Sequence, residues 1–410
     1  MTTSRTLLRA LRDRDAGLYL TGLVVSAFGT SSLSLASGMW VKDLTGSDSL
    51  PALCMLAAWS PTLAGPALGT IADRVRRTPL LIGLNLALAA ALPALFAVRS
   101  ADGLWLLLTV LFLYGTAGAV AEAAESALVT AVVPAELRGD FNGLRMTVTE
   151  GMKLVAPLTG AGLYAAFGGP AVACLDAVTF VIAAGLYALL RVREERPVPS
   201  GGGWRKETAE GVRHLRRHPV LRPLVRAGGT TMLLASLSST TVYAVVDRLG
   251  HSAAYTGVLS AVQGAGSVTA GLVSGTALRR LGARRFAAAG IVLTALAVAA
   301  RAVPSDAVAL VSAAAIGLGL PWVLVAAFTA VQQHTPGPLL GRATATANTL
   351  VLAPTVLGLG VGAGLLELAS PALLSPLYGL ALLGTAASLA QRTGSASRTA
   401  ARSPSDASPT

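Results

Sequence analysis

Apolar runs long enough to cross a membrane follow one another through almost the whole chain, with short charged stretches between them. A helix needs about 20 residues to cross the hydrocarbon core of a bilayer. Only 13% of the 410 residues are charged, against roughly 25% in an ordinary soluble domain. The sequence therefore predicts an all-α polytopic membrane protein with twelve transmembrane helices. We read these spans at 17–41, 49–71, 79–98, 104–131, 143–167, 170–190, 221–246, 253–278, 286–304, 306–333, 343–367 and 372–390.

The basic residues fall almost entirely on one side of these predicted spans. With the N-terminus placed in the cytoplasm, 27 of the 32 Lys and Arg residues lie on the cytoplasmic side, Arg145 among them, in the loop before the fifth span. Because cytoplasmic loops carry an excess of Lys and Arg, we predict a multi-pass protein of the bacterial inner membrane with both termini cytoplasmic. The net charge of +12 then faces lipid headgroups, so no nucleic-acid partner is expected.

The two halves of the chain share a pattern of spans and short motifs. "GTIADRVRR" at 69–77 has a partner in "GTALRRLGARR" at 275–285, and "DLTGS" at 43–47 is echoed by "DRLGHS" at 247–252. We therefore predict two six-helix pseudo-repeats around a central cavity, a layout described for secondary transporters. The predicted domains are a six-helix bundle at 1–190, a cytoplasmic linker at 191–220, a second six-helix bundle at 221–390 and a disordered cytoplasmic tail at 391–410.

Within the linker, an amphipathic helix is predicted from about Trp204 to His218. We expect Trp204, Val212 and Leu215 to face lipid and the arginines of this segment to face the headgroups. His214 and His218 lie four residues apart, but no further ligand is close in sequence, so a solvated basic face is expected rather than a metal pair.

The remaining sequence signals argue against cofactor chemistry. Cys54 and Cys174 both fall inside apolar runs and are too few for a zinc site. The chain has no G-x-x-x-x-G-K-[ST] loop and no arguable catalytic set. We expect no metal, no cofactor and no enzymatic activity, and we expect a monomer in the lipid bilayer.

The motif at 69–77 reads G-x-I-A-D-R-x-x-R and resembles the signature between the second and third spans of the major facilitator superfamily. The matching residues are Gly69, Ala72, Asp73, Arg74 and Arg77, whereas Arg76 stands where the family usually has a second glycine. The twelve spans, the repeat and the basic central loop fit the same family.

This resemblance implies that Asp73 holds the halves together on the cytoplasmic side by facing the first turn of the eleventh span, near Arg342–Thr346. A carboxylate at a helix N-terminus gains roughly 0.3–2 kcal/mol. The alternative is a turn that only sets topology, with Asp73 as a helix cap.

A second, weaker resemblance is to the drug–proton antiporters of this family, whose fifth span ends in Gly-Pro-x-x-Gly-Gly. "APLTGA" at 156–161 keeps Pro157 and Gly160, and Gly143 lies at the expected upstream spacing, while Ala156 and Ala161 replace two glycines. The linker run "EGVRHLRRHPVLR" is similar to a branch of drug and macrolide efflux permeases.

Ionisable residues inside spans are the strongest functional pointers, because each one is costly there unless it is paired or hydrated. Glu122 and Glu125 lie three apart in the fourth span, and Glu150 and Lys153 lie three apart in the fifth. Glu125 and Glu150 are predicted at matching depth, roughly 10 Å from the cytoplasmic end of each span.

Two interpretations of this cluster stay open. In one, Lys153 pairs with Glu122 or Glu125 and only fixes packing. In the other, the surplus carboxylates carry a proton or attract a cationic substrate. Asp176 of the sixth span, nearer the outside, receives little weight, and Tyr114 is one of several candidate cavity residues.

The sequence and these resemblances together predict a secondary active transporter that exports lipophilic drug-like or natural-product small molecules by proton-coupled alternating access. An uptake carrier for a small polar metabolite and a non-transporting membrane sensor or partner protein are the alternatives.

Overall fold

The computed structural model describes residues 14–65, 68, 75–132, 138–192 and 204–400. Some side chains inside its helices, including those of residues 150, 153 and 391–400, are not described. The described residues are almost all helical, with no strand among them, so the predicted all-α class is confirmed.

The helices of the first half follow one another from residue 14 to residue 188. They are α2 (Arg14–Thr45), α3 (Pro51–Trp59), η1 (Ser60–Ala64), α5 (Arg77–Ala91), η2 (Leu92–Ala97), η3 (Ala101–Gly103), α6 (Leu104–Val132), α7 (Arg138–Phe167) and α8 (Gly169–Ala188). The helices of the second half are α9 (Trp204–Arg217), α10 (Leu221–Ser239), α11 (Val242–Arg248), α12 (Tyr255–Ala300), α13 (Asp306–His334), α14 (Gly337–Leu368) and α15 (Pro371–Ala400).

Nine helices in the described part of the chain are long and apolar enough to cross a membrane. One of them, α12, contains both the eighth and the ninth predicted span, because the chain passes from one to the other at Gly282 with no intervening loop. The second and fifth predicted spans coincide with the shorter apolar helices Pro51–Ala64 and Val155–Phe167. Each predicted span thus contains described helix, while the full count of twelve crossings stays a prediction.

Gly282 has φ 74° and ψ 157°, a conformation that side chains with a Cβ rarely adopt. At this residue the helix direction changes, which separates Tyr255–Leu281 from the segment that begins at Ala283. Gly168, with φ 78°, makes a comparable break between α7 and α8, and Pro170 then starts α8 at a position where a missing N–H is tolerated.

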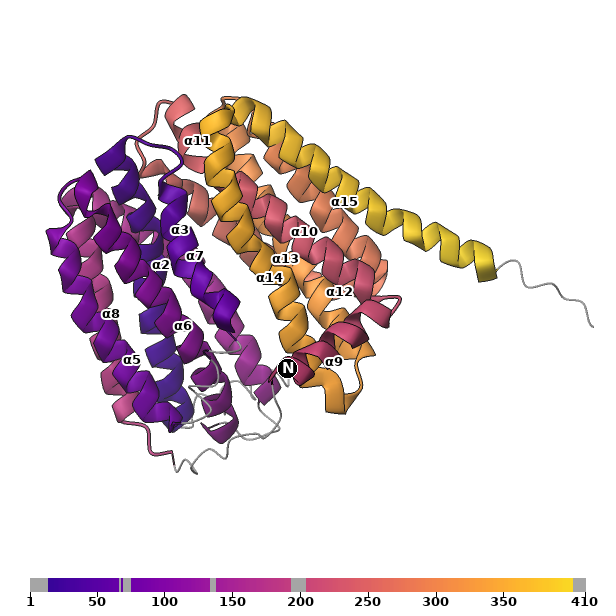
Figure 1. The fold of residues 1–410 in the computed structure, drawn as a ribbon, viewed down its shortest axis with the longest axis horizontal. Helices are drawn as coiled ribbons and strands as arrows, with labels where there is room; N and C mark the ends of the chain where they lie inside the picture. The colour runs from indigo at the N-terminus through magenta and orange to yellow at the C-terminus, as the bar shows by residue number, and fades with distance from the viewer. Residues whose placement is uncertain (1–13, 66–67, 69–74, 133–137, 193–203, 401–410) are drawn as a thin grey trace, which may run out of the picture.

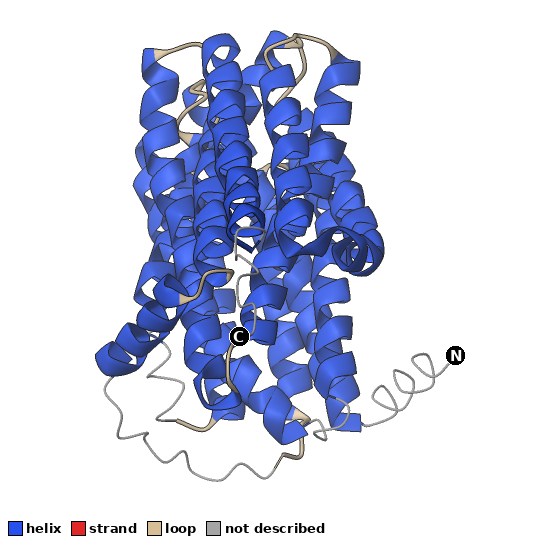
Figure 2. Cartoon of the chain, turned by 90° about the vertical axis from the view of Figure 1, so that its right-hand side faces the viewer, coloured by secondary structure: helices blue, strands red, loops and turns tan. Residues whose placement is uncertain are grey.

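The helices form two bundles that lie side by side, one from each half of the chain (Figure 1). Most of them run roughly along a common direction, as a second view at right angles also shows (Figure 2), whereas α9 and α15 lie obliquely to the rest (Figure 1). We call the end of the molecule where α11 lies the α11 end, and the opposite end, where α9 lies, the α9 end. Large apolar side chains are exposed on both bundles: Trp105 of α6 is 67% exposed and Leu368 of α14 is 83% exposed, as expected for a surface that contacts lipid.

Three segments differ from the sequence prediction. Helix α7 begins at Arg138, so Arg145 lies inside a helix and not in the predicted loop. Helix α15 continues to Ala400, past the predicted end of the second bundle at residue 390, because residues 391–400 contain no proline that would stop the helix. Leu215 of α9 is 1% exposed and packs into the core of the second bundle instead of facing lipid.

Candidate functional site

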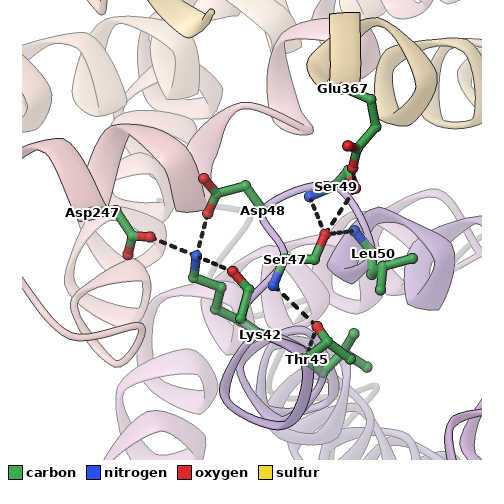
Figure 3. A network of polar contacts seen from close by, with 10 residues as sticks. Lys42, Thr45, Ser47, Asp48, Ser49, Leu50, Asp247 and Glu367 are labelled. Carbon is green, nitrogen blue, oxygen red and sulfur yellow. Dashed lines mark hydrogen bonds and ion pairs between the residues drawn. The ribbon is translucent and has the colours of Figure 1, made fainter. Parts of the chain in front are cut away.

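At the α11 end, one lysine joins the two halves of the molecule. The Nζ atom of Lys42, in the last turn of α2, lies 2.5 Å from Asp48 Oδ1 in its own half and 2.5 Å from Asp247 Oδ2 in α11 (Figure 3). The Lys42 side chain is only 11% exposed. An ammonium group has three donors and no acceptor, so two carboxylates and the Gly46 carbonyl can bind it at the same time.

A second polar link lies beside the first. The hydroxyl of Ser49, just before α3, donates to Glu367 Oε1 near the end of α14 (Figure 3). Ser49 is held in place locally, because its backbone N–H donates to Ser47 Oγ and the two hydroxyls lie 2.9 Å apart. The polar links that the structure describes between the halves, Lys42–Asp247 and Ser49–Glu367, both lie at the α11 end.

Close helix packing joins the halves at the same end. Helix α7 packs against α12, and a Cβ added to Gly257 of α12 would lie 2.5 Å from Ala161 Cβ and 3.3 Å from the Pro157 carbonyl oxygen of α7. Helix α3 packs against α14. Because Gly257 has no side chain, α12 approaches α7 more closely than any larger residue would allow.

The residues Pro157 and Gly160, predicted as a helix-packing motif, lie on α7 at this interface. A Cβ on Gly160 would be 2.7 Å from the Ser32 carbonyl oxygen, so Gly160 packs directly on the backbone of α2. The Ser32 hydroxyl donates to the Ala156 carbonyl at 3.0 Å, which ties the same two helices together. The segment therefore contacts α2 on one side and α12 on the other.

In the acidic cluster, the partner of Glu125 is Arg145. The Arg145 Nη2 atom lies 2.8 Å from Glu125 Oε2, and the Tyr19 hydroxyl lies 3.5 Å from the same oxygen. Tyr19 is 1% exposed and its ring stacks with Tyr187 and packs against Phe141. Glu125 is thus held by a cation and enclosed by aromatic rings, toward the α9 end of α6 and α7.

The other members of the predicted cluster are less fully described. Glu122 lies on α6 one turn before Glu125 and is exposed. Glu150 and Lys153 lie within α7, but their side chains fall outside the described part of the chain. The pairing of Lys153 with a glutamate therefore stays a prediction, and the described ion pair of Glu125 is with Arg145.

Most of the predicted cytoplasmic gate motif also falls outside the described residues. Gly69, Asp73 and Arg74 are not described, and Arg77 is the first residue of α5. The segment predicted to meet Asp73, the first turns of α14, contacts α9: Arg342 Nη1 lies 2.6 Å from Glu210 Oε2. Helix α9 is thus attached to the second bundle at this end.

Three histidines from different parts of the second half meet where α9 joins α10. The ring centroids of His214 and His218 lie 5.9 Å apart, and those of His218 and His334 lie 5.3 Å apart. His218 Nδ1 accepts hydrogen bonds from the backbone N–H groups of Val220 and Leu221. Among the described residues, no group of three possible ligands is arranged to hold a metal ion.

A buried carboxyl group lies in the middle of the first bundle. Asp176 of α8 is fully buried, and its Oδ2 atom lies 3.0 Å from the Tyr114 hydroxyl of α6. The Tyr114 hydroxyl also lies 2.7 Å from Thr30 Oγ1 of α2, and Thr179 Oγ1 lies 3.1 Å from Asp176 Oδ1. Three helices therefore contribute to one hydrogen-bonded group.

The sequence pattern of the Major Facilitator Superfamily matches residues 19–358. The chain belongs to the Major Facilitator Superfamily.

Two of the relatives that match part of the chain are macrolide efflux proteins. The chain is similar to macrolide efflux protein A of Streptococcus pyogenes, at 27% identity over 52% of this chain and 54% of the relative. It is also similar to macrolide efflux protein A of Enterococcus faecalis, at 26% identity over 46% of this chain and 60% of the relative. The matches thus span only about half the length of these relatives.

Two transporters of known structure cover nearly the whole chain. A transporter of the POT family, PepTSo, has a TM-score of 0.73 at 12% identity, covering 93% of this chain and 98% of its own. A bacterial homologue of the iron transporter ferroportin, in an inward-facing state, has a TM-score of 0.70 at 16% identity, with coverage of 93% and 98%. At these identities the likeness shows the shared fold, and the family match over residues 19–358 shows the superfamily.

Sequence reasoning missed three of the contacts described above. Lys42 was one of a few outer basic residues, and it directly precedes the echo at 43–47 whose partner begins with Asp247; that echo was the available signal. Arg145 is predicted in a loop, although Asn142 and Thr149 lie three residues before and four residues after it, a spacing typical of one face of a helix. Asp176 receives little weight from the sequence because of its position nearer the outside, and its partners Thr30 and Tyr114 lie far away in the sequence, on α2 and α6.

Proposed function

We propose that the protein is a secondary active transporter that exports lipophilic drug-like or natural-product small molecules by proton-coupled alternating access. Superfamily membership supports transport of a small molecule across the membrane. The similarity to macrolide efflux proteins supports efflux and an apolar substrate class. The strongly apolar helices support a multi-pass location, for which we propose the bacterial inner membrane with both termini in the cytoplasm.

The observation that carries this proposal is the contact between the halves at the α11 end. Lys42 and Asp247 form an ion pair across the halves, Ser49 donates to Glu367, and Gly257 packs on Ala161. Surface ion pairs and small-residue contacts are individually weak, so such an interface can open and close without unfolding either bundle. We infer that the α11 end faces the outside and is closed in this structure, so that the substrate path opens toward the cytoplasm.

The predicted site residues receive roles within this cycle. We propose that Glu122, Glu125, Glu150 and Lys153 form a proton or substrate pathway near the cytoplasmic side. In this pathway Arg145 compensates the charge of Glu125. We also propose that Gly69, Asp73, Arg74 and Arg77 form the cytoplasmic gate, and that Pro157 and Gly160 allow α7 to move against α2 and α12. The partners of the protein are then its substrate, protons and lipid, and it acts as a monomer.

Everted membrane vesicles test this proposal directly. Vesicles that contain the protein should accumulate a radiolabelled macrolide when their interior is acidified, and a protonophore should abolish this accumulation. Vesicles from the same cells without the gene provide the background. Accumulation that persists without a pH difference would contradict proton coupling.

The alternatives give different results in the same vesicles. An uptake carrier would bind or move a sugar or amino acid and leave the macrolide outside. A sensor would move none of these probes. Full proton-driven transport by all three variants Glu122→Gln, Glu125→Gln and Glu150→Gln would show that the acidic pathway is structural.

A further inference from the structure

The carboxyl group of Asp176 is the buried end of a chain of hydrogen-bonded oxygens. Asp176, Tyr114 and Thr30 lie on three different helices, and their oxygens are separated by 3.0 Å and 2.7 Å in a single chain. Asp176 is 0% exposed, whereas Tyr114 and Thr30 are partly exposed. The chain of oxygens therefore leads from a partly exposed hydroxyl to a fully enclosed carboxyl group.

Space for this carboxyl group is provided by a glycine. A Cβ on Gly29 of α2 would overlap both Asp176 Oδ1 and Thr179 Oγ1. The close approach of α2 to α8 at Gly29 therefore encloses the carboxyl group without filling its place. Any other residue at position 29 would push either the carboxyl group or the helix away.

The charge of Asp176 is not compensated by a cation in the described part of the chain. Its described partners are the hydroxyls of Tyr114 and Thr179, and no described Lys, Arg or His forms an ion pair with it. Helix α8 packs against α2, α5, η2 and α7, and α2 contributes Gly29 and Thr30 to this group. Among the described side chains, the titratable group in contact with Asp176 is Tyr114 of α6. This differs from Glu125, which has Arg145. A buried carboxylate without a cation is costly, and binding a proton removes the charge.

Both protonation states can be satisfied by the same oxygen atoms. When Asp176 is ionised, Tyr114 donates to Asp176 and Thr30 donates to Tyr114. When Asp176 is protonated, Asp176 donates to Tyr114 and Tyr114 donates to Thr30. Each hydroxyl has one hydrogen and can also accept, so reversing the direction of the chain needs no movement of the heavy atoms.

We propose that Asp176 is a proton-carrying site of this transporter and that Thr30 and Tyr114 relay the proton to it. A proton from water binds Thr30 Oγ1, the Thr30 proton passes to the Tyr114 oxygen, and the Tyr114 proton passes to Asp176 Oδ2. Each hydroxyl gains one proton and gives one up, and release follows the reverse order. This inference rests on the proposed proton-coupled export, and it adds a site in the middle of the first bundle to the acidic pathway near the α9 end.

Infrared difference spectroscopy tests protonation independently of transport. The full-length protein in lipid nanodiscs is titrated between about pH 5 and 9, the range in which a shifted buried carboxyl group is expected to change state. We expect a carbonyl band of a protonated carboxylic acid that decreases as the pH rises. Subtracting the Asp176→Asn spectrum separates the contribution of Asp176 from that of the glutamates, and Tyr114→Phe and Thr30→Val should displace the midpoint of this contribution. Thr109→Val is the matched control, because the Thr109 hydroxyl donates only to the Trp105 carbonyl of its own helix.

The possible outcomes separate this inference from the proposed function. If the parent and Asp176→Asn show the same pH-dependent carboxyl bands over the whole range, the inference is overturned even if the vesicles show proton-driven export. An Asp176 band that titrates in nanodiscs, together with vesicles that move no macrolide, would support the site and reject the export proposal. If Asp176→Asn does not fold, the midpoint shifts in Tyr114→Phe and Thr30→Val decide, and unchanged midpoints in both would count against the relay.

The same variants give a transport readout. In everted vesicles, Asp176→Asn should reduce pH-driven macrolide accumulation at least tenfold, while Thr109→Val should behave like the unaltered protein. Full pH-driven accumulation by Asp176→Asn would show that Asp176 is a structural hydrogen-bonding group.

Discussion

The ammonium group of Lys42 and the carboxylate of Asp247 lie 2.5 Å apart although they belong to opposite halves of the molecule. Asp48 shares the same ammonium group from the first half. Because this contact must break when the α11 end opens, it sets part of the free-energy difference between the closed and the open state.

Replacing Lys42 by Met should shift the molecule toward the state that is open at the α11 end. Asp247 is 45% exposed, so solvent screens the pair and its loss is expected to cost about 1 kcal/mol, a change of roughly fivefold in the population ratio. Spin labels at Ser100→Cys and Ser252→Cys, with the native cysteines replaced, should report a larger share of long distances. Lys42→Arg keeps the charge and should resemble the parent. An unchanged distance distribution in Lys42→Met would mean that the ion pair does not bias the equilibrium.

Gly257→Val should prevent the α11 end from closing fully. The new Cβ would lie 2.5 Å from Ala161 Cβ, and overpacking of this kind typically costs 1–3 kcal/mol. Transport should fall sharply, and the same pair of spin labels should show the open distance. Gly271→Val, in the same helix but with nothing near its added side chain, controls for the loss of glycine. Equal transport by the two variants would contradict a role for Gly257 in closure.

Arg145→Met should reduce the amount of folded protein in the membrane. It leaves Glu125, whose side chain is 13% exposed, without its described cation, and breaking a buried pair in this way typically costs about 3–5 kcal/mol. The double variant Arg145→Met with Glu125→Gln should restore the amount of protein, as measured by fluorescence-detected size-exclusion chromatography. Arg99→Met, which removes an exposed arginine, is the control. Normal levels of Arg145→Met alone would point to another cation for Glu125.

The attachment of α9 to α10 should weaken in acid. Burial, followed by His334 and His214, lowers the pKa of His218 below its ordinary value of 6.5, so the folded state binds this proton less readily than an unfolded chain does. Protonated Nδ1 can no longer accept from Val220 and Leu221, and Arg284, which donates to the Pro219 carbonyl, adds positive charge nearby. The attachment is therefore complete above about pH 6.5 and is lost as the pH falls below it.

Hydrogen–deuterium exchange of α9 and the first turn of α10 measures this effect. After correction for the intrinsic exchange rate, protection should decrease between about pH 7 and 5. His218→Asn keeps an acceptor that does not titrate, and its protection should stay constant. The same acid-dependent loss in His218→Asn would assign the effect to another group.

The predicted topology places both ends of the chain and the linker in the cytoplasm. Single cysteines at Ser200 and Ser405, two positions outside the described residues, should react with a membrane-impermeant maleimide in everted vesicles only. Labelling of either cysteine in intact cells would show that the orientation is the opposite one, with the α11 end facing the cytoplasm.

Properties that depend on composition along the chain could be predicted from the sequence, whereas pairings across the fold could not. Each predicted span contains described helix, because a run of about 20 apolar residues has few other stable states in a membrane. The break at Gly282 lies inside the predicted loop at 279–285. A glycine between arginines is equally compatible with a loop and with a kink between two helices, so the sequence could locate the break but not its form. The partner of Glu125 was missed because Arg145 lies in a polar turn of α7 that looks like loop when only hydropathy is read.

Helix α9 shows how two sequence signals can compete. The spacing of its apolar residues predicted a helix on lipid, and the structure has a helix at Trp204–Arg217. Its apolar side instead packs on α10 and α14, where Gly211 lies against Thr346 and the Arg342 carbonyl. An amphipathic pattern states that one face is buried, but it does not state whether lipid or protein covers that face.

The packing of α9 also determines where the chain could be divided into two separately synthesised fragments. Leu215 fills part of the core of the second bundle and Gly211 fits against α14, so a fragment that begins after Arg217 would lack a piece of its own interior. A fragment that begins just before Trp204 would keep that piece. Genes cut at these two positions should therefore differ in complementation, even though both cuts lie between the predicted six-helix bundles.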